Sequence, residues 1–133
     1  MNPFIAAVGD VLALGLVTLI GFATHGETAL SFTPRMAAAF FPLTLCWFLL
    51  APWFGMFDAG IVLDPHQLWR PPLAMAFAAP LAAVLRGLVL NAPVLPIFAL
   101  VLGGTSASGM LVWRAVFLRL SRTIRPHQDR RRV

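Results

Sequence analysis

Long apolar segments separated by short polar ones form the main pattern of this chain. Met36 to Phe57 contains no charged side chain, and Pro71 to Trp113 is interrupted only by Arg86. Such lengths match or exceed the roughly 20 residues that an α-helix needs to cross a bilayer. Because a backbone in lipid must satisfy its own hydrogen bonds, the pattern predicts an all-α, polytopic membrane protein.

We expect one domain, residues 1–125, built as a four-transmembrane-helix bundle with short loops. Pro3 suits a first helical turn, and the polar residues His25 to Glu27 mark the exit of the first helix. The loop at 58–70 and the turn at 91–93 set the other boundaries. The expected helices cover residues 4–24, 36–57, 72–90 and 93–113, and the last two form an antiparallel hairpin.

A basic segment follows the fourth helix. Phe117, Leu120 and Ile124 repeat on one helical face, with arginines on another. This arrangement predicts a surface helix to residue 125 that is attracted to anionic lipid, and then a basic tail over residues 126–133. Arginine runs also suit nucleic acid, but the positive-inside rule explains them without a further partner. We therefore expect a lipid partner and no nucleic acid.

The arginines also predict an orientation. The net charge of +5 comes from ten arginines, no lysine and five acidic residues. In a four-helix arrangement both termini share a side with the loop at 58–70, and that side holds Arg70 and the seven arginines from position 114 onwards. The other side holds Arg35 and, near its boundary, Arg86. Because the side with the termini holds more arginines, the positive-inside rule predicts that both termini lie in the cytoplasm.

Three charges are expected within the bundle. Asp10 lies about 10 Å along the first helix from Pro3, in the cytoplasmic third of the bilayer. A carboxylate there is a candidate proton or cation site. The structural alternative is an acid that is protonated, or paired with Arg114 at the same depth. We favour the structural role.

Arg86 lies about 7 Å inside the opposite end of the third helix, too far from Asp10 in depth to meet it. His25 and Glu27 form the outer boundary on that side. A pair between Arg86 and Glu27 would lower the free energy of burying the guanidinium group, and we favour it over ligand binding.

Small residues cluster in the fourth helix. Side chains of this size at four-residue spacing let helix backbones approach closely in lipid. We expect them to pack the hairpin of the last two helices, with an oligomer face as the alternative. The helix-packing candidates are Gly103, Gly104, Ser108 and Gly109.

Catalytic and cofactor signatures are missing from the sequence. It contains no G-x-S-x-G, H-E-x-x-H or C-x-x-C motif, and its single cysteine, Cys46, lies in an apolar segment. None of the three histidines lies at mid-membrane depth, where an axial ligand of a central haem would be needed. Asp58, Asp64 and His66 share a loop, but their spacing matches no metal signature. We expect no enzyme activity, no cofactor and no metal.

Several features occur in an order that resembles a known family. They are Asp10, the exit from Gly21 to Glu27, Phe41-Pro42, Arg86, and Trp113-Arg114. The chain resembles a family of small four-helix prokaryotic membrane proteins that is catalogued only as a domain of unknown function. The resemblance implies a four-helix fold and the prokaryotic inner membrane, and it implies no activity.

The functional hypothesis is a non-catalytic accessory or assembly subunit of a larger membrane complex, for example an energy-transducing one. Its partners would be other membrane subunits or further copies of the chain. The alternative is a small dimeric proton-coupled transporter that uses Asp10, because an intramembrane acid in the first of four helices suits proton coupling.

Overall fold

Helices joined by turns and short irregular segments, without a strand, make up residues 3 to 124, the part of the chain that the computed structural model describes. Four of its helical segments are long and apolar enough to cross a membrane. The prediction of an all-α protein with four spans is therefore confirmed. The elements are α1 (Pro3–Thr24), η1 (Leu30–Phe32), α2 (Thr33–Leu50), η2 (Ala51–Phe54), α3 (Ala59–Val62), η3 (Pro65–Gln67), α4 (Arg70–Leu90) and α5 (Pro96–Ile124).

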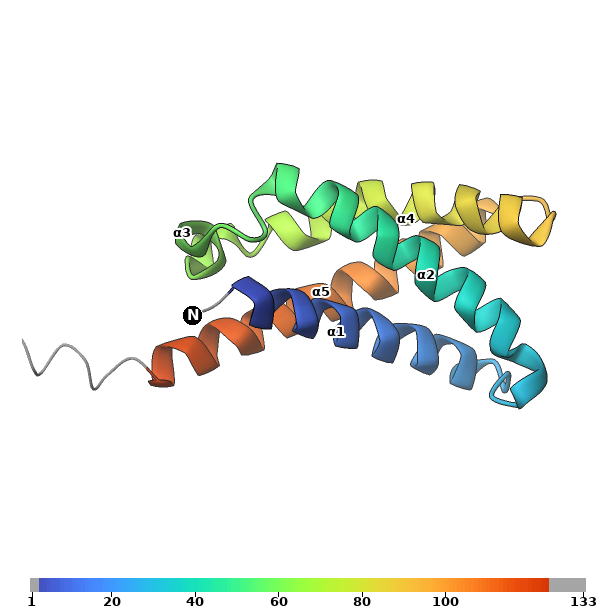
Figure 1. The fold of residues 1–133 in the computed structure, drawn as a ribbon, viewed down its shortest axis with the longest axis horizontal. Coiled ribbons are helices and arrows are strands. Elements are labelled where there is room, and N and C mark those ends of the chain that lie inside the picture. The colour runs from blue at the N-terminus through green and yellow to red at the C-terminus, as the bar shows by residue number, and fades with distance from the viewer. Residues whose placement is uncertain (1–2, 125–133) are drawn as a thin grey trace, which may run out of the picture.

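The four long helices run alternately up and down (Figure 1). Helix α4 packs against α2 and α5, while α1 packs against α2 and α5 from the other side. The start of α1, the short helix α3 and the last turns of α5 lie at one end of the bundle. We call this the terminal end, and the end that carries η1 and residues 91–95 the hairpin end.

The core lies between α2, α4 and the middle of α5, and α1 adds Leu14 to it. Its largest fully buried apolar side chains are Trp47, Leu14, Leu43, Met75 and Met110. Helix α4 contributes mainly alanines to this core, and a face without large side chains lets α2 and α5 approach its backbone. The buried alanines of α4 are Ala74, Ala78, Ala79, Ala82 and Ala83.

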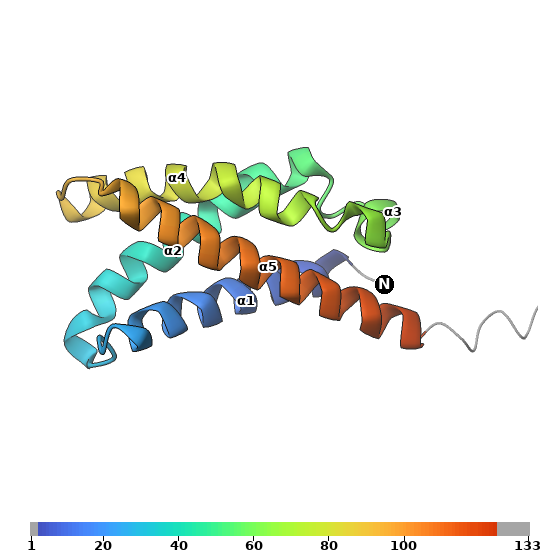
Figure 2. The same cartoon turned by 180° about the vertical axis from the view of Figure 1, so that it is seen from behind.

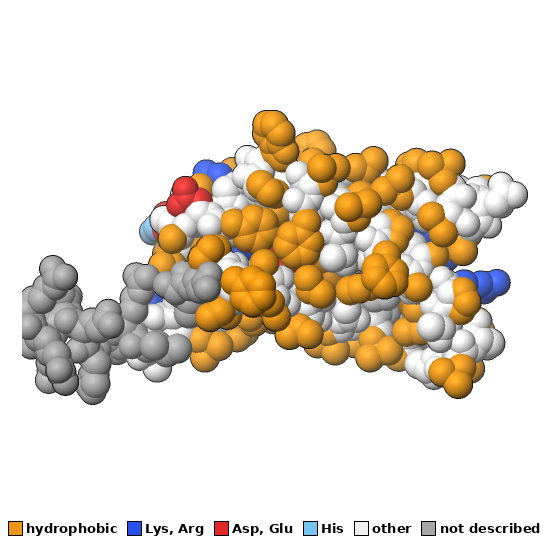
Figure 3. Space-filling model, viewed as in Figure 1, with side chains coloured by type: hydrophobic (Ala, Val, Ile, Leu, Met, Phe, Trp, Pro, Cys, Tyr) orange, Lys and Arg blue, Asp and Glu red, His pale blue; other side chains and the backbone are white. Residues whose placement is uncertain are grey.

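The outside of the bundle is apolar. Large hydrophobic side chains such as Leu12, Leu49, Leu88 and Leu100 are each more than half exposed. Hydrophobic side chains cover the visible face of the body, and charged ones gather towards its two ends (Figure 3). A water-soluble domain would not expose apolar surface on this scale, whereas a bilayer covers it.

Helix α2 ends earlier than the sequence pattern predicts. The α-helix stops at Leu50, and the tighter turn η2 continues the span to Phe54. Pro52 has no amide hydrogen for the α-helical ladder, and Gly55 ends the turn in the left-handed region with a φ of 70°. The expected helix over residues 36–57 therefore ends in a different geometry from the one predicted.

Helix α5 is longer than predicted. It begins at Pro96 rather than 93, and it continues to Ile124 without the expected change into a separate surface helix. No proline or glycine follows Trp113 within α5, so nothing in the backbone interrupts the helix. Arg125 and the expected tail over residues 126–133 lie outside the described residues.

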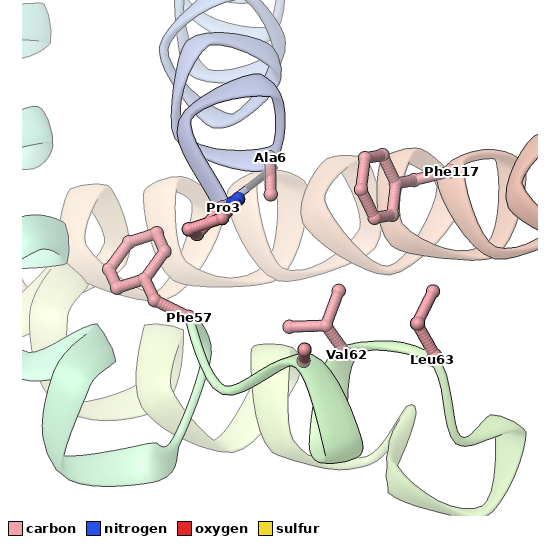
Figure 4. A pocket seen from close by; sticks show the side chains of 7 residues that line it. Pro3, Ala6, Phe57, Val62, Leu63 and Phe117 are labelled. Carbon is pink, nitrogen blue, oxygen red and sulfur yellow. The ribbon is translucent and has the colours of Figure 1, made fainter. Parts of the chain in front are cut away.

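The extension of α5 packs on the bundle. Phe117 and Leu118 are buried, and Phe117 faces the first turn of α1 and the turns around α3 (Figure 4). The cavity between them measures only about 20 Å³, room for about one water molecule. It is therefore a packing defect rather than a ligand site. Its lining is Pro3, Ala6, Phe57, Ala59, Val62, Leu63 and Phe117.

Candidate functional site

The carboxylate of Asp10 lies inside the bundle with no exposed surface. It belongs to the second turn of α1, on the side that faces α2 and α5. Three donors reach its two oxygens: Trp47 Nε1 lies 3.0 Å from Oδ2, Trp113 Nε1 lies 2.9 Å from Oδ1, and Arg114 Nη2 donates to Oδ2. The acid is thus bound from two different helices.

Arg114 is the counter-charge of Asp10. The two form a salt bridge in which Arg114 is 4% exposed, so the pairing that their shared depth suggested is present. The second nitrogen, Nη1, donates to the backbone oxygen of Met56 at 2.9 Å, and the guanidinium group lies 5.9 Å from the ring centroid of Phe57. One arginine therefore ties α1 and α5 to the turn that follows η2.

The sequence pattern did not predict the two tryptophans as partners of Asp10. Both indole N–H groups are buried donors that need an acceptor, and Asp10 is that acceptor. Counting depth from the predicted helix ends does not match Trp47 to Asp10, because Trp47 lies ten residues before the predicted end at Phe57 and Asp10 lies six residues after the predicted start at Phe4. The two depths agree only when counted from the observed end of η2 at Phe54. Trp113 is only partly exposed, and its polar atom points inward.

Taken together, Asp10, Arg114, Trp47 and Trp113 form what we call the Asp10 cluster. The carboxylate is paired with Arg114 and accepts from both indole N–H groups, while Arg114 Nε has no hydrogen-bond partner among the described residues. Breaking such a pair leaves an uncompensated buried charge, so the arrangement holds the helices in one relative position. Both carboxylate oxygens already accept hydrogen bonds within the bundle, an arrangement that suits a structural role.

Arg86 lies near the opposite end of the bundle, and the expected pair with Glu27 is not formed. Instead, the guanidinium group lies 4.3 Å from the ring centroid of Phe98 in α5. Within residues 3–124 no hydrogen bond or ion pair reaches it, and its Nε is buried without a partner. The prediction was wrong because the sequence gives the depth of Arg86 but not the direction in which its side chain leaves α4.

Arg86 lines a cavity of about 380 Å³. We call it the Arg86 cavity. The boundary residues His25 and Glu27 both line it, so the structure gathers them around Arg86 without bonding them to it. Its other walls are mostly apolar, with three threonines. The full lining is Val17, Thr18, Gly21, Phe22, Thr24, His25, Glu27, Ala39, Arg86, Phe98, Val101, Leu102 and Thr105.

The small residues of α5 face different neighbours. A Cβ atom on Gly103 would touch Ala79 of α4, and one on Gly109 would overlap Val17 of α1. Gly104 and Ser108 are exposed, and nothing lies within 4 Å of a Cβ built on Gly104. The expectation that these two pack the hairpin of α4 and α5 was wrong, because successive small residues point around the whole circumference of the helix.

The acids of the 58–70 loop make local contacts. Asp58 accepts from the amide of Gly60 at 2.8 Å, and Asp64 accepts from the amide of His66 at 2.9 Å. Each carboxylate thereby caps the short helical turn that follows it. In the described part of the chain, no three His, Cys, Asp or Glu side chains gather as a metal site would require.

The four long apolar helices define a multi-pass helical membrane protein. Residues 7–117 match the family described as "Protein of unknown function (DUF3054)", so the chain belongs to this family. Neither a curated protein nor a solved structure matches the chain. The family membership confirms the resemblance noted from Asp10, Arg86 and Trp113-Arg114, and it assigns no activity.

Proposed function

We propose that this protein is a non-catalytic integral membrane protein that serves as an accessory or assembly subunit of a larger membrane complex. The observation that carries the proposal is the sealed environment of Asp10. The carboxylate has no exposed surface and receives three donors. An acid held in this way stabilises the bundle and offers no open position to a substrate.

The exposed surface of α5 supports a role next to other subunits. Among the four spanning segments, α5 has the smallest fraction of its most apolar stretch buried inside the chain. Leu111, Val112 and Val116 face outwards along it. In lipid, such a helix associates through close packing rather than through the hydrophobic effect, so its free face suits the helix of another subunit.

The proposed location is the prokaryotic cytoplasmic (inner) membrane, with both termini in the cytoplasm. Arg119 and Arg122 are exposed at the terminal end, and further arginines follow in the sequence. Arg114 is engaged inside the bundle, but removing it from the count leaves a large arginine excess on that side. The positive-inside rule therefore supports the cytoplasmic orientation, and the exposed arginines suit contact with anionic lipid.

The alternative function is a dimeric proton-coupled transporter that uses Asp10. Such a protein needs a carboxylate that gains and loses a proton during transport and that is reached from water. Asp10 is instead enclosed by Trp47, Trp113 and Arg114. This geometry favours the structural role.

Purification of the whole chain from its native membrane tests the proposal. After gentle detergent extraction, mass spectrometry should find partner subunits in a fixed ratio to the chain. A chain that elutes only as itself would contradict the subunit role. In a second experiment, vesicles containing the purified chain should show no proton-driven uptake. Uptake by these vesicles would establish the transporter instead.

A further inference from the structure

We infer that the Arg86 cavity binds the anionic head group of an amphiphile, whose apolar chain lies in a groove between α1 and α5. The head group would be a carboxylate or a phosphate. This site lies at the hairpin end, away from the Asp10 cluster, and the inference does not rest on the accessory-subunit role.

The space for this ligand exists because α1 and α5 cross and then separate. At the crossing a Cβ on Gly9 would overlap Trp113, and a Cβ on Gly109 would overlap Val17. Further towards the hairpin end, nothing lies within 4 Å of a Cβ built on Gly21 or Gly104. Figure 2 shows the two helices diverging in this direction.

The Arg86 cavity continues sideways into an open groove of about 700 Å³. The two spaces share five lining residues, so a ligand can occupy both. The groove adds Ile20, Gly104 and Ser108, and it faces the apolar surroundings of the bundle. Its walls suit a hydrocarbon chain, because they consist of small and aliphatic side chains. The shared residues are Val17, Gly21, Thr24, Val101 and Thr105.

The electrostatics of the cavity favour an anion. Arg86 has no hydrogen-bonded or ion-paired partner in the described chain, although its Nε is buried. Glu27 lines the cavity without forming an ion pair with Arg86, and Arg35 adds a second positive charge nearby. A carboxylate or phosphate would supply the charge-assisted hydrogen bonds that the guanidinium group lacks.

The depth of Arg86 in the bundle also matches the depth expected for the head group of an amphiphile. It lies one helical turn before the end of α4 at Leu90, and so near the edge of this apolar span. The groove runs from this level towards the middle of the bundle, past Gly104 and Ser108. A membrane lipid and a free fatty acid both have this polarity.

The full chain in phosphatidylcholine nanodiscs provides the test. Phosphatidylglycerol, palmitate or inorganic phosphate is added, and native mass spectrometry counts the molecules that each chain retains. Retention of about one phosphatidylglycerol or one palmitate supports the site and identifies its source as membrane lipid or free acid. Equal retention of phosphatidylcholine, or binding of inorganic phosphate as tight as that of both amphiphiles, would overturn it.

Charge variants distinguish binding at this site from non-specific attraction of anions to the basic surface of the protein. Arg86→Gln should lower retention about tenfold, the effect of losing a hydrogen bond between charged groups. Arg119→Gln, which removes an exposed arginine at the terminal end, should leave retention unchanged. Equal losses in both variants would contradict the proposal. Glu27→Gln should raise retention, a gain that a purely structural Arg86 would not produce.

Shape variants test the groove even if Arg86→Gln lowers stability. Gly104→Leu places a side chain in the groove and should lower retention, whereas Ala76→Leu on the exposed face of α4 should not. Arg86→Lys keeps the charge and should retain most of the binding. If a cysteine at Gly21 instead cross-links to the helix of another protein and no amphiphile is retained, the groove belongs to a partner and the inference is wrong.

Discussion

The indole ring of Trp113 lies against the backbone of Gly9, in the space that a Cβ atom at position 9 would occupy. This close approach brings Trp113 Nε1 to 2.9 Å from Oδ1 of Asp10, the residue next to Gly9. The glycine therefore decides how closely α5 can cross α1, and with it whether Asp10 receives its donor from Trp113.

Replacing Gly9 tests this relationship. Gly9→Ala should destabilise the bundle by about 1 to 3 kcal/mol, because the methyl group displaces the indole ring. The melting temperature in detergent measures the effect. Gly21→Ala is the matched control in the same helix, since nothing lies within 4 Å of its Cβ. Equal melting temperatures for the two variants would show that α5 does not approach α1 as described.

The buried ion pair predicts a double-mutant cycle. Asp10→Asn should destabilise the protein by about 3 to 5 kcal/mol, because Arg114 would remain buried without a counter-charge. The amide group of asparagine also points two donor hydrogens towards donors of Trp113 or Trp47. The double variant Asp10→Asn/Arg114→Gln should regain much of that loss. Additive losses in denaturant unfolding would mean that the two residues do not interact.

Trp47 offers a milder change at the same cluster. Trp47→Phe keeps a buried ring but removes the N–H that Asp10 Oδ2 accepts at 3.0 Å. We expect a loss of about 1 to 3 kcal/mol, because one donor to a charged group disappears and a smaller ring fills the site. Trp53→Phe is the control, since Trp53 is 86% exposed. Thermal unfolding should separate the two variants clearly.

Depth along the helices could be predicted from the sequence. Counting residues from the helix ends placed Asp10 and Arg114 at one level, and the structure joins them. The same count predicted that Arg86 and Asp10 lie at different depths. The rise per residue is nearly constant in a helix, so sequence distance from a boundary translates directly into depth.

Rotation about the helix axes could not be predicted. The spanning segments are apolar on all sides, so hydrophobic periodicity does not identify the face that turns inward. Arg86 accordingly lies over Phe98 rather than beside Glu27, and Gly104 faces outward although Gly103 faces α4. The tryptophan donors of Asp10 depended on the same missing information.

The proposed orientation predicts a labelling pattern. With Cys46 replaced by serine, single cysteines at Thr28 and His66 test the two ends, because both residues are exposed. A membrane-impermeant maleimide added to intact cells should label position 28 and reach position 66 only after the membrane is opened. Labelling of position 66 in intact cells would reverse the orientation that the arginines predict.

The crossing of α1 and α5 predicts opposite outcomes for two glycines in the same helix. Gly109→Leu should lower the melting temperature, because even a Cβ at this position overlaps Val17 of α1 and a leucine would push the helices apart. Gly104→Leu should leave the melting temperature close to that of the parent, because its side chain would extend into the open groove. Both substitutions replace glycine by leucine within α5, so helix propensity changes equally in the two variants. A large loss for Gly104→Leu, with none for Gly109→Leu, would mean that α5 presents its other face to the bundle.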